Sequence, residues 1–170
     1  RLREDSQAAG RWETAQGGEY FAAGVGGAIT GRGADLLIID DPHSEQDAMN
    51  LTALERAYEW YTSGPRQRLQ PGGQIICVMT RWNVKDLTGM LMQAQSEAKA
   101  DQWELVEFPA IMPSGKPVWP EYWKLGELET VKASLSLGKW NAQWMQNPTS
   151  EEGAIIKREW WKKWDHNFMP

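Results

Sequence analysis

The chain carries Leu36-Leu37-Ile38-Ile39-Asp40-Asp41-Pro42 in its N-terminal half. The four consecutive apolar residues predict a strand that is buried on both faces, as is typical of parallel sheets covered by helices. The run Ile75-Ile76-Cys77-Val78-Met79 predicts a second such strand, and Trp103 to Pro109 predicts a third by alternation. Between these predicted strands, apolar residues recur at the spacing of a helix. The order strand, helix, strand, helix, strand predicts an α/β fold with a largely parallel sheet.

Two helices are predicted between these strands. The first has the capping-box spacing at Thr52 to Glu55 and ends at Gly64-Pro65, and the second covers residues 86–100. The apolar positions that share one helix face are Leu51, Leu54, Tyr58 and Tyr61 in the first helix, and Leu87, Leu91, Ala94 and Ala98 in the second. Elsewhere, residues 1–19 predict a polar, glycine-rich loop or the frayed remains of an interrupted element. Residues 20–30 predict a strand or tight hairpin, and Pro71-Gly72-Gly73 predicts a turn.

The C-terminal half has a different character. Prolines predict an irregular loop after Pro109, helical spacing returns from Leu125 to Leu135, and Trp140 and Trp144 lie four residues apart on a further short helix. Eight of the 11 tryptophans follow residue 100. Because tryptophans at helical spacing are typical of a core or an interdomain seam, this half predicts a small, helical and irregular Trp-rich subdomain.

The composition is that of a folded domain. With 170 residues, 41% of them apolar, and a net charge of −5, the chain is neither disordered nor collagen-like. Its short apolar runs predict no membrane span. The mild negative charge argues against binding nucleic acid through bulk electrostatics, although a local basic patch remains open. The one cysteine, Cys77, predicts a buried inert thiol in a reducing compartment. Since Arg1 replaces the usual Met, we interpret the chain as a piece of a longer protein.

Asp40 and Asp41 carry the strongest chemical signal. A carboxylate at the carboxyl end of a buried parallel strand faces the crevice where α/β sheets bind ligands, and there it can hold Mg²⁺ through water. A second acid beside it can orient the water that attacks a γ-phosphoryl group, which is the Walker B arrangement of P-loop ATPases. The alternative is a strand end that turns into a solvated loop. The phosphate-binding motif Gly-x-x-x-x-Gly-Lys-Ser/Thr is absent from the sequence.

Thr80 and Arg81 end the second predicted strand. A polar residue at this position in a nucleotide-driven motor can sense the γ-phosphate, whereas the simpler alternative is a hydroxyl that caps the next turn. Arg32 can stabilise phosphate charge in its own or a neighbouring subunit, or lie on a solvated loop tip. His43 stands near the two acids, but with one other histidine in the chain we interpret it as a loop residue bonded to the backbone rather than a zinc ligand.

The C-terminal tail is basic and aromatic, and it leaves two interpretations open. Its side chains can contact nucleic acid by phosphate pairing and stacking, or form an amphipathic linker that docks on a neighbouring domain. The residues concerned are Lys157, Arg158, Trp160, Trp161, Lys162, Lys163 and Trp164.

The order and spacing of several stretches are more specific than any one of them. They are Gly31 to His43, Thr80-Arg81-Trp82 with Asp86 to Gly89, Phe108 to Ile111, Trp119-Pro120-Glu121, Gln146 to Thr149, and Glu152 to Trp160. Together they cover about residues 20–164 and resemble the large terminase subunit of tailed bacteriophages, the ATPase and nuclease that packs DNA into the procapsid. In that family the phosphate-binding loop lies upstream of the residues matched here.

The resemblance implies a role for each candidate residue. Asp40 would be the magnesium ligand that binds the cofactor Mg-ATP, and Asp41 would occupy the position of the catalytic base. Thr80 and Arg81 would form the coupling motif, and Arg32 would stabilise phosphate charge. Asp41 departs from the Glu that many relatives carry, and its side chain is one methylene shorter.

The resemblance also implies a domain organisation and partners. Residues 1–112 would be the C-terminal part of a P-loop ATPase domain of the ASCE type, residues 113–148 a small subdomain or linker, and residues 149–170 a hinge before a nuclease domain. The implied partners are double-stranded DNA, a portal protein, a small terminase subunit and further copies in a ring, with no membrane partner. The implied location is the host cytoplasm, at the procapsid during packaging.

Two other functions remain open on the sequence. Another P-loop motor, such as a helicase, has the same acidic strand end. A non-enzymatic α/β module could instead dock a partner through its Trp-rich half.

Overall fold

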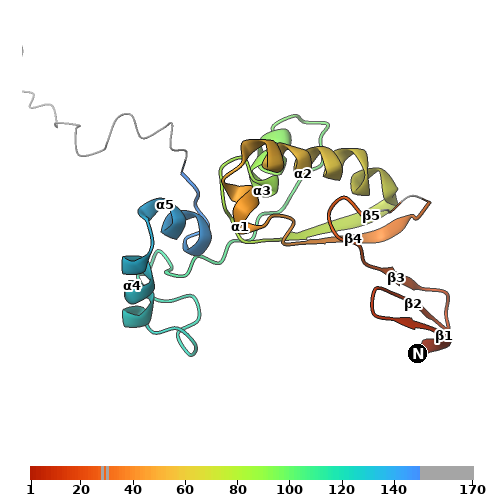
Figure 1. Ribbon diagram of the computed structural model, residues 1–170, viewed down its shortest axis with the longest axis horizontal. Coiled ribbons are helices and arrows are strands. Elements are labelled where there is room, and N and C mark those ends of the chain that lie inside the picture. Colours follow the sequence, from red (N-terminus) through yellow and green to blue (C-terminus); the bar gives the residue numbers. More distant parts are fainter. Residues whose placement is uncertain (28, 30, 150–170) are drawn as a thin grey trace, which may run out of the picture. The chain divides into compact units, whose positions relative to one another are not determined.

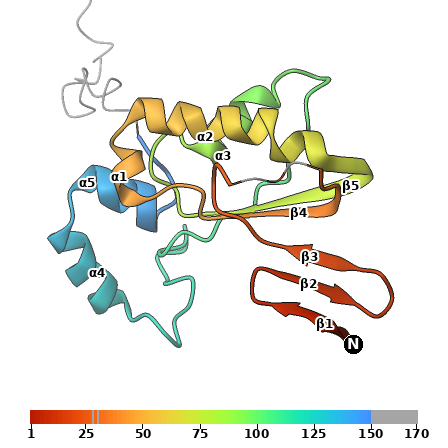
Figure 2. The ribbon, with the colours of Figure 1, turned by 45° about the vertical axis from the view of Figure 1, so that its right-hand side comes forward.

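The computed structural model describes residues 1–27, 29 and 31–149 (Figures 1 and 2). The chain forms two compact units, Arg1–Met79 and a second that begins at Thr80. In the described residues, the fold is mixed α/β, with a three-stranded antiparallel sheet, a two-stranded parallel sheet and short helices. The predicted α/β class is therefore confirmed, but the prediction of a largely parallel sheet is wrong for the described residues, since β4 and β5 are the one parallel pair there and the larger sheet is antiparallel. The predicted basic and aromatic segment from Lys157 to Trp164 lies outside the described residues.

The N-terminal residues form a sheet rather than the predicted loop. Strands β1 (Leu2–Ala8), β2 (Arg11–Thr14) and β3 (Glu19–Phe21) pair antiparallel in this order. Trp12 lies opposite Tyr20, and their rings stack with centroids 4.9 Å apart. Cross-strand aromatic pairs and opposite charges stabilise such small sheets. The loop prediction was wrong because this sheet is polar on both faces and gives no alternation of apolar residues.

Strands β4 (Ala34–Asp40) and β5 (Leu69–Val78) form the parallel pair. Both predicted strands are thus present, and β5 begins earlier than expected. The predicted turn at residues 71–73 lies inside β5, where Gly72 has φ +81° and the register with β4 shifts. The chain continues as a strand here because a bulge absorbs the glycines, and a β-carbon on Gly73 would lie 3.0 Å from the carbonyl oxygen of Asp35.

The parallel pair is covered on one face, contrary to the prediction that both faces are buried. Side chains alternate along both strands, and the face with Ile39 is largely covered, with Cys77 only half-buried. In both ribbon views α2 (Leu51–Ser63) runs alongside the pair (Figures 1 and 2). The opposite face, here called the outer face, leaves four aliphatic side chains 47–58% exposed: Leu36, Ile38, Ile76 and Val78. The apolar runs predicted strands correctly, but they do not reveal how many elements cover them.

Three helical segments connect β4 to β5: α1 (Glu45–Ala48), α2 and the 3-10 helix η1 (Pro65–Arg68). Helix α2 begins one residue before the predicted capping residue Thr52, because the Asn50 side chain accepts hydrogen bonds from the main-chain N–H of Thr52 and of Ala53. It ends before Gly64, as predicted. Its buried residues are Leu54, Ala57 and Tyr61, whereas Leu51, which the prediction placed on the buried face, is exposed.

The capping box lies on α1 instead. The Asp47 carboxylate accepts hydrogen bonds of 2.8 Å from both the main-chain N–H and the hydroxyl of Ser44, and these bonds lower the pKa of Asp47. Because the folded pKa of Asp47 is lowered, the stability that its carboxylate contributes is complete above the ordinary pKa of about 4. That contribution is lost as the pH falls through the lower folded pKa.

We expect Asp47→Asn to reduce the free energy of unfolding at pH 7 and to have little effect near pH 2. Urea unfolding at both pH values measures this difference, and an equal effect at both would contradict it.

The second unit contains α3 (Leu87–Ala94), α4 (Leu125–Ser134), α5 (Leu137–Lys139) and the π-helical turn η2 (Trp140–Trp144). The predicted helices near residues 125–135 and 140–144 are present. Helix α3 ends six residues before the predicted position 100, because the chain folds back at Gln95. There the side-chain oxygen of Gln95 accepts from the main-chain N–H of Trp103 at 3.0 Å.

Residues 103–109 form no strand, contrary to the prediction. Their alternation is real, but a strand also needs a neighbouring edge that accepts its main-chain hydrogen bonds. Here the N–H of Trp103 donates to the side chain of Gln95, and the N–H of Ala110 donates to the carbonyl of Trp144 at 2.7 Å. Phe108 is 70% exposed.

The core of the second unit is aromatic, as the spacing of its tryptophans predicted. Trp140 is buried, and its ring stacks on Trp144, which meets Trp123 edge to face. The core residues are Ala110, Leu128 and Trp140, with Ile111, Trp123, Val131, Leu135, Trp144 and Met145 packed against them. In the part of the chain that the structure describes, no helix has the length and apolar character needed to cross a membrane.

Candidate functional site

Asp40 and Asp41 lie at the carboxyl end of the parallel pair. Asp40 is the last residue of β4 and lies opposite Val78, the last residue of β5. The N–H of Asp41 donates to the carbonyl of Val78 at 2.9 Å, so the ladder extends one residue past the strand. Both aspartates are exposed. The structure therefore brings the two predicted acids to one edge of the sheet, where α/β proteins bind ligands.

The backbone of Asp41 is strained. Its φ is +42°, and it precedes Pro42, which normally restricts the preceding residue to extended conformations. Among the described residues other than glycine, Asp41 and Gln146 are the two with positive φ. Such conformations cost about 1–3 kcal/mol and are concentrated at functional sites. Both residues fall within stretches that carry the resemblance noted from the sequence.

Asp40 and Asp41 are the accessible carboxylates at this edge of the sheet. Within residues 1–27, 29 and 31–149, no group of three or more His, Cys, Asp or Glu side chains is placed to hold a metal ion. His43 is 6% exposed, while the two aspartates are accessible. Mg²⁺ is typically held by one or two carboxylates together with water and substrate phosphates. Asp40 and Asp41 can supply that carboxylate share.

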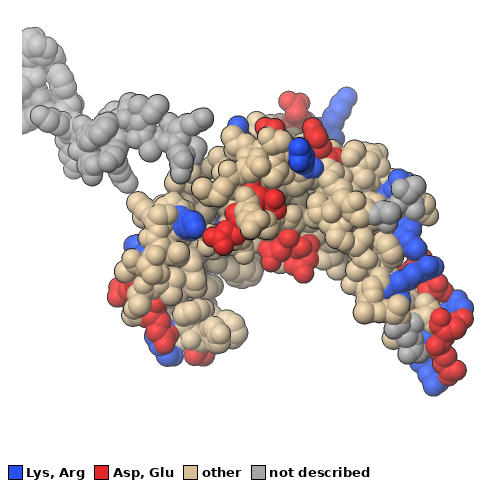
Figure 3. Space-filling model, in the orientation of Figure 1, with Lys and Arg blue, Asp and Glu red and all other residues tan. Residues whose placement is uncertain are grey.

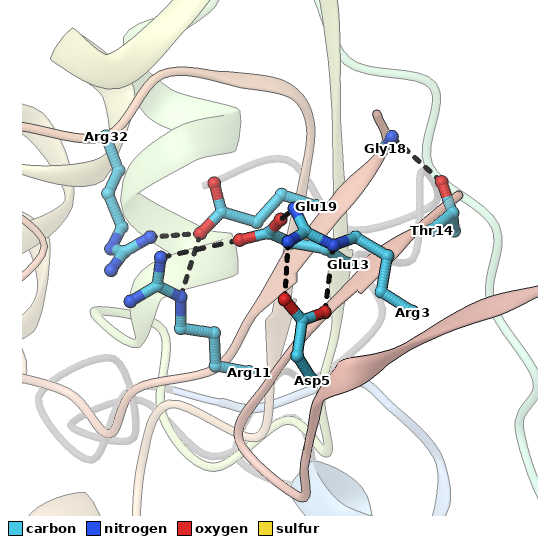
Figure 4. Close-up of polar contacts among 8 residues, drawn as sticks. All are labelled: Arg3, Asp5, Arg11, Glu13, Thr14, Gly18, Glu19 and Arg32. Carbon is cyan, nitrogen blue, oxygen red and sulfur yellow. Dashed lines mark hydrogen bonds and ion pairs between the residues drawn. The ribbon is translucent and has the colours of Figure 1, made fainter. Parts of the chain in front are cut away.

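Arg32 lies in a different part of the first unit. Its guanidinium pairs with Glu19 (Figure 4). The same guanidinium lies over the ring of Phe21, 4.1 Å from the ring centroid. Arg11 also contacts Glu19, at 3.3 Å. Arg32 is therefore held against the β1–β3 sheet and is not a solvated loop tip. Its proposed action on phosphate stays a prediction, which requires release from Glu19.

The β1–β3 sheet carries further ion pairs. Arg3 contacts Asp5 with two hydrogen bonds of 2.7 and 3.0 Å and Glu13 with one of 2.6 Å (Figure 4). The pairing raises the pKa of Arg3, and its hydrogen bonds lower the pKa of Asp5. Figure 3 shows acidic and basic side chains interspersed over this sheet. Because these charges are exposed, each pair contributes little to stability.

Thr80 and Arg81 open the second unit, in a loop that is built around Asp86. The Asp86 side chain is fully buried, and Arg81 Nε donates to its two oxygens at 3.0 and 3.1 Å. The same carboxylate accepts from three main-chain N–H groups, those of Trp82 at 2.9 Å, Asn83 at 3.2 Å and Gly89 at 2.9 Å. We call residues 80–86 the Asp86 loop. This one carboxylate fixes both the loop and the first turn of α3.

The geometry assigns Arg81 a part in shaping this loop. Besides Asp86, its guanidinium contacts the carbonyl of Asn83 at 3.4 Å, so the side chain folds back on its own loop. The cap of α3 is Asp86, whereas one interpretation of the sequence gave the capping role to the Thr80 hydroxyl. Gly89 completes the arrangement, because a β-carbon there would lie 2.0 Å from the carbonyl oxygen of Val84.

Sequence reasoning missed the part that Asp86 plays in fixing this loop. The available signal was an aspartate directly before an apolar helix and five residues after an arginine. That signal predicts a helix cap, but it does not show that the carboxylate is buried or that it pairs with Arg81.

Comparison with family models and with curated proteins finds no match to this chain.

Proposed function

We propose that this chain is part of a DNA-packaging motor ATPase of the terminase large-subunit class, and contains the carboxylate half of its nucleotide site. One observation carries the proposal. Two adjacent carboxylates stand at the carboxyl end of a parallel strand pair, and the second is held in a strained backbone conformation. This is the placement that phosphoryl transfer requires of its metal-binding and water-orienting acids.

Each residue has a role in this proposal. Asp40 would hold Mg²⁺ through water, and Asp41 would orient the attacking water. When bound, Mg²⁺ neutralises charge on the β- and γ-phosphates. Thr80 would respond to the γ-phosphate, with its position set by the loop that Arg81 and Asp86 stabilise. The phosphate-binding loop would come from outside these 170 residues, since the sequence holds none. In this assignment the fold is part of a P-loop ATPase.

A second candidate function is a docking module, which a different observation favours. Trp119 and Tyr122 stack with centroids 4.9 Å apart, and are 58% and 64% exposed. Exposed aromatic pairs are typical anchors of protein interfaces. In this alternative, Trp119→Ala would abolish partner binding and the protein would not hydrolyse ATP.

The test uses the complete gene product that contains these residues. We expect Mg²⁺-dependent ATP hydrolysis that double-stranded DNA stimulates, and little or no hydrolysis by residues 1–170 alone. A complete gene product that neither binds nor hydrolyses ATP would overturn the proposal. The coding sequence separates the motor classes, because a terminase carries Gly-x-x-x-x-Gly-Lys-Ser/Thr upstream and an acidic, metal-binding nuclease downstream, whereas a helicase lacks that nuclease.

A further inference from the structure

Gln146 connects the Asp86 loop to the aromatic core, across 65 residues of sequence. Its side-chain oxygen accepts from the main-chain N–H of Arg81 at 3.3 Å. Its side-chain nitrogen donates to the carbonyl of Gln143 at 2.6 Å. Because the amide nitrogen is held by Gln143, the amide oxygen is turned toward Arg81. An amide can make both bonds at once, since it carries a donor and an acceptor in one group.

The two structures that Gln146 joins are each fixed by other contacts. On one side, the buried carboxylate of Asp86 holds the main chain from Trp82 to Gly89. On the other side, Trp144 lies in the aromatic core, and its carbonyl accepts from the N–H of Ala110. A displacement of Arg81 would therefore reach η2 through the two hydrogen bonds of the Gln146 side chain.

The backbone of Gln146 is also unusual. Its φ of +55° is a conformation that side chains other than Gly, Asn and Asp rarely adopt. Glycine would satisfy this conformation at lower cost, and it would lack the amide. The presence of a glutamine here favours a role for the side chain itself.

We propose that Gln146 is a positioning residue that transmits movement of Thr80 and Arg81 to the aromatic core around Trp140 and Trp144. This inference rests on the proposed function, because the movement it transmits is the response of Thr80 to the γ-phosphate. It names the path by which the nucleotide state would reach the segment that follows η2.

The first part of the test measures the link without nucleotide. Gln146→Gly removes the amide while it relieves the backbone, and Gln146→Glu keeps the acceptor but loses the donor to Gln143. The matched control is Gln143→Ala, because Gln143 contributes its main-chain carbonyl to this link. In the complete gene product, we expect hydrogen exchange of the Arg81 amide to be about fivefold faster in Gln146→Gly than in wild type or the control. Unchanged exchange would overturn the inference.

The second part measures transmission. With Gln146→Gly, we expect ATP hydrolysis within about twofold of wild type, while the change of Trp fluorescence on adding Mg-ATP and the DNA translocated per ATP each fall about tenfold. If Gln146 had only a structural role, the fluorescence change on adding Mg-ATP and the DNA translocated per ATP would both stay at their wild-type values. That result would also overturn the inference. If the wild type hydrolyses no ATP, the proposed function fails and transmission fails with it, while the exchange measurement still decides whether the link exists.

Discussion

Asp40→Ala is expected to lower Mg²⁺-dependent ATP hydrolysis by the complete gene product on the order of 10³-fold, a loss like that of other groups that stabilise charge in phosphoryl transfer. Asp40 ends β4 at the edge where the strands terminate, and its side chain is exposed. Since the Asp40 side chain is exposed and belongs to no core, the fold should tolerate its loss. We expect unfolding stability within about 0.5 kcal/mol of wild type.

Asp35→Ala is the matched control for this measurement. Asp35 is an exposed aspartate on the same strand, near its opposite end. Steady-state ATP hydrolysis, measured over a range of Mg²⁺ concentrations, should be unchanged in this control. If Asp40→Ala retained a tenth or more of the wild-type rate at saturating Mg²⁺, as a rough threshold, the assignment of Asp40 would be wrong.

The second large effect is expected from Asp86→Ala, which should destabilise the second unit by about 3–5 kcal/mol. The substitution removes the partner of Arg81, which is 14% exposed, and leaves the main-chain N–H groups of Trp82 and Gly89 without their acceptor. Buried donors that lose their acceptor, and a buried charge that loses its partner, each carry a large desolvation cost. Urea unfolding monitored by Trp fluorescence measures the loss.

Two further variants complete this test: one is a control, and the other shows whether the contact between Arg81 and Asp86 contributes to the loss. Glu97→Ala removes an exposed carboxylate from the same unit and should have almost no effect. Arg81→Ala should lower the free energy of unfolding less in the Asp86→Ala background than in wild type, because the partner of Arg81 is already absent there. Fully additive effects would show that the contact between the two side chains contributes nothing.

The apolar strands were the most predictable part of the fold, and the way they are covered was the least. Leu36 to Ile39 predicted β4 because a short run of consecutive apolar residues, followed by a turn signal, is typical of a strand in a folded core. The same residues gave no indication that Leu36 and Ile38 would lie on an exposed face, since that depends on neighbouring elements. Residues 103–109 show the converse, because an alternating pattern predicts a strand whether or not an edge is available to pair with it.

The candidate site was predictable where it depends on local order and unpredictable where it depends on distant contacts. Asp40 and Asp41 follow an apolar strand directly, so their place at the sheet edge could be predicted. The strained backbone of Asp41 could not be predicted, because its positive φ is set by contacts that form only in the folded chain. The burial of Asp86 could not be predicted either, because it depends on how the folded main chain of residues 82–89 surrounds the carboxylate. The contact between Gln146 and Arg81 joins residues whose spacing in sequence carries no signal.

The pairing of β4 with β5 also sets an order of events during synthesis. The β1–β3 sheet can form once residues 1–21 have left the ribosome, because its pairings are local. Asp40 must wait for Val78, which is 38 residues later (78 − 40). At about 5–20 residues per second this delay is roughly 2–8 s. During that interval the aliphatic residues of β4 are exposed without their partner strand, so the nascent chain offers chaperones a binding segment that the finished protein has paired.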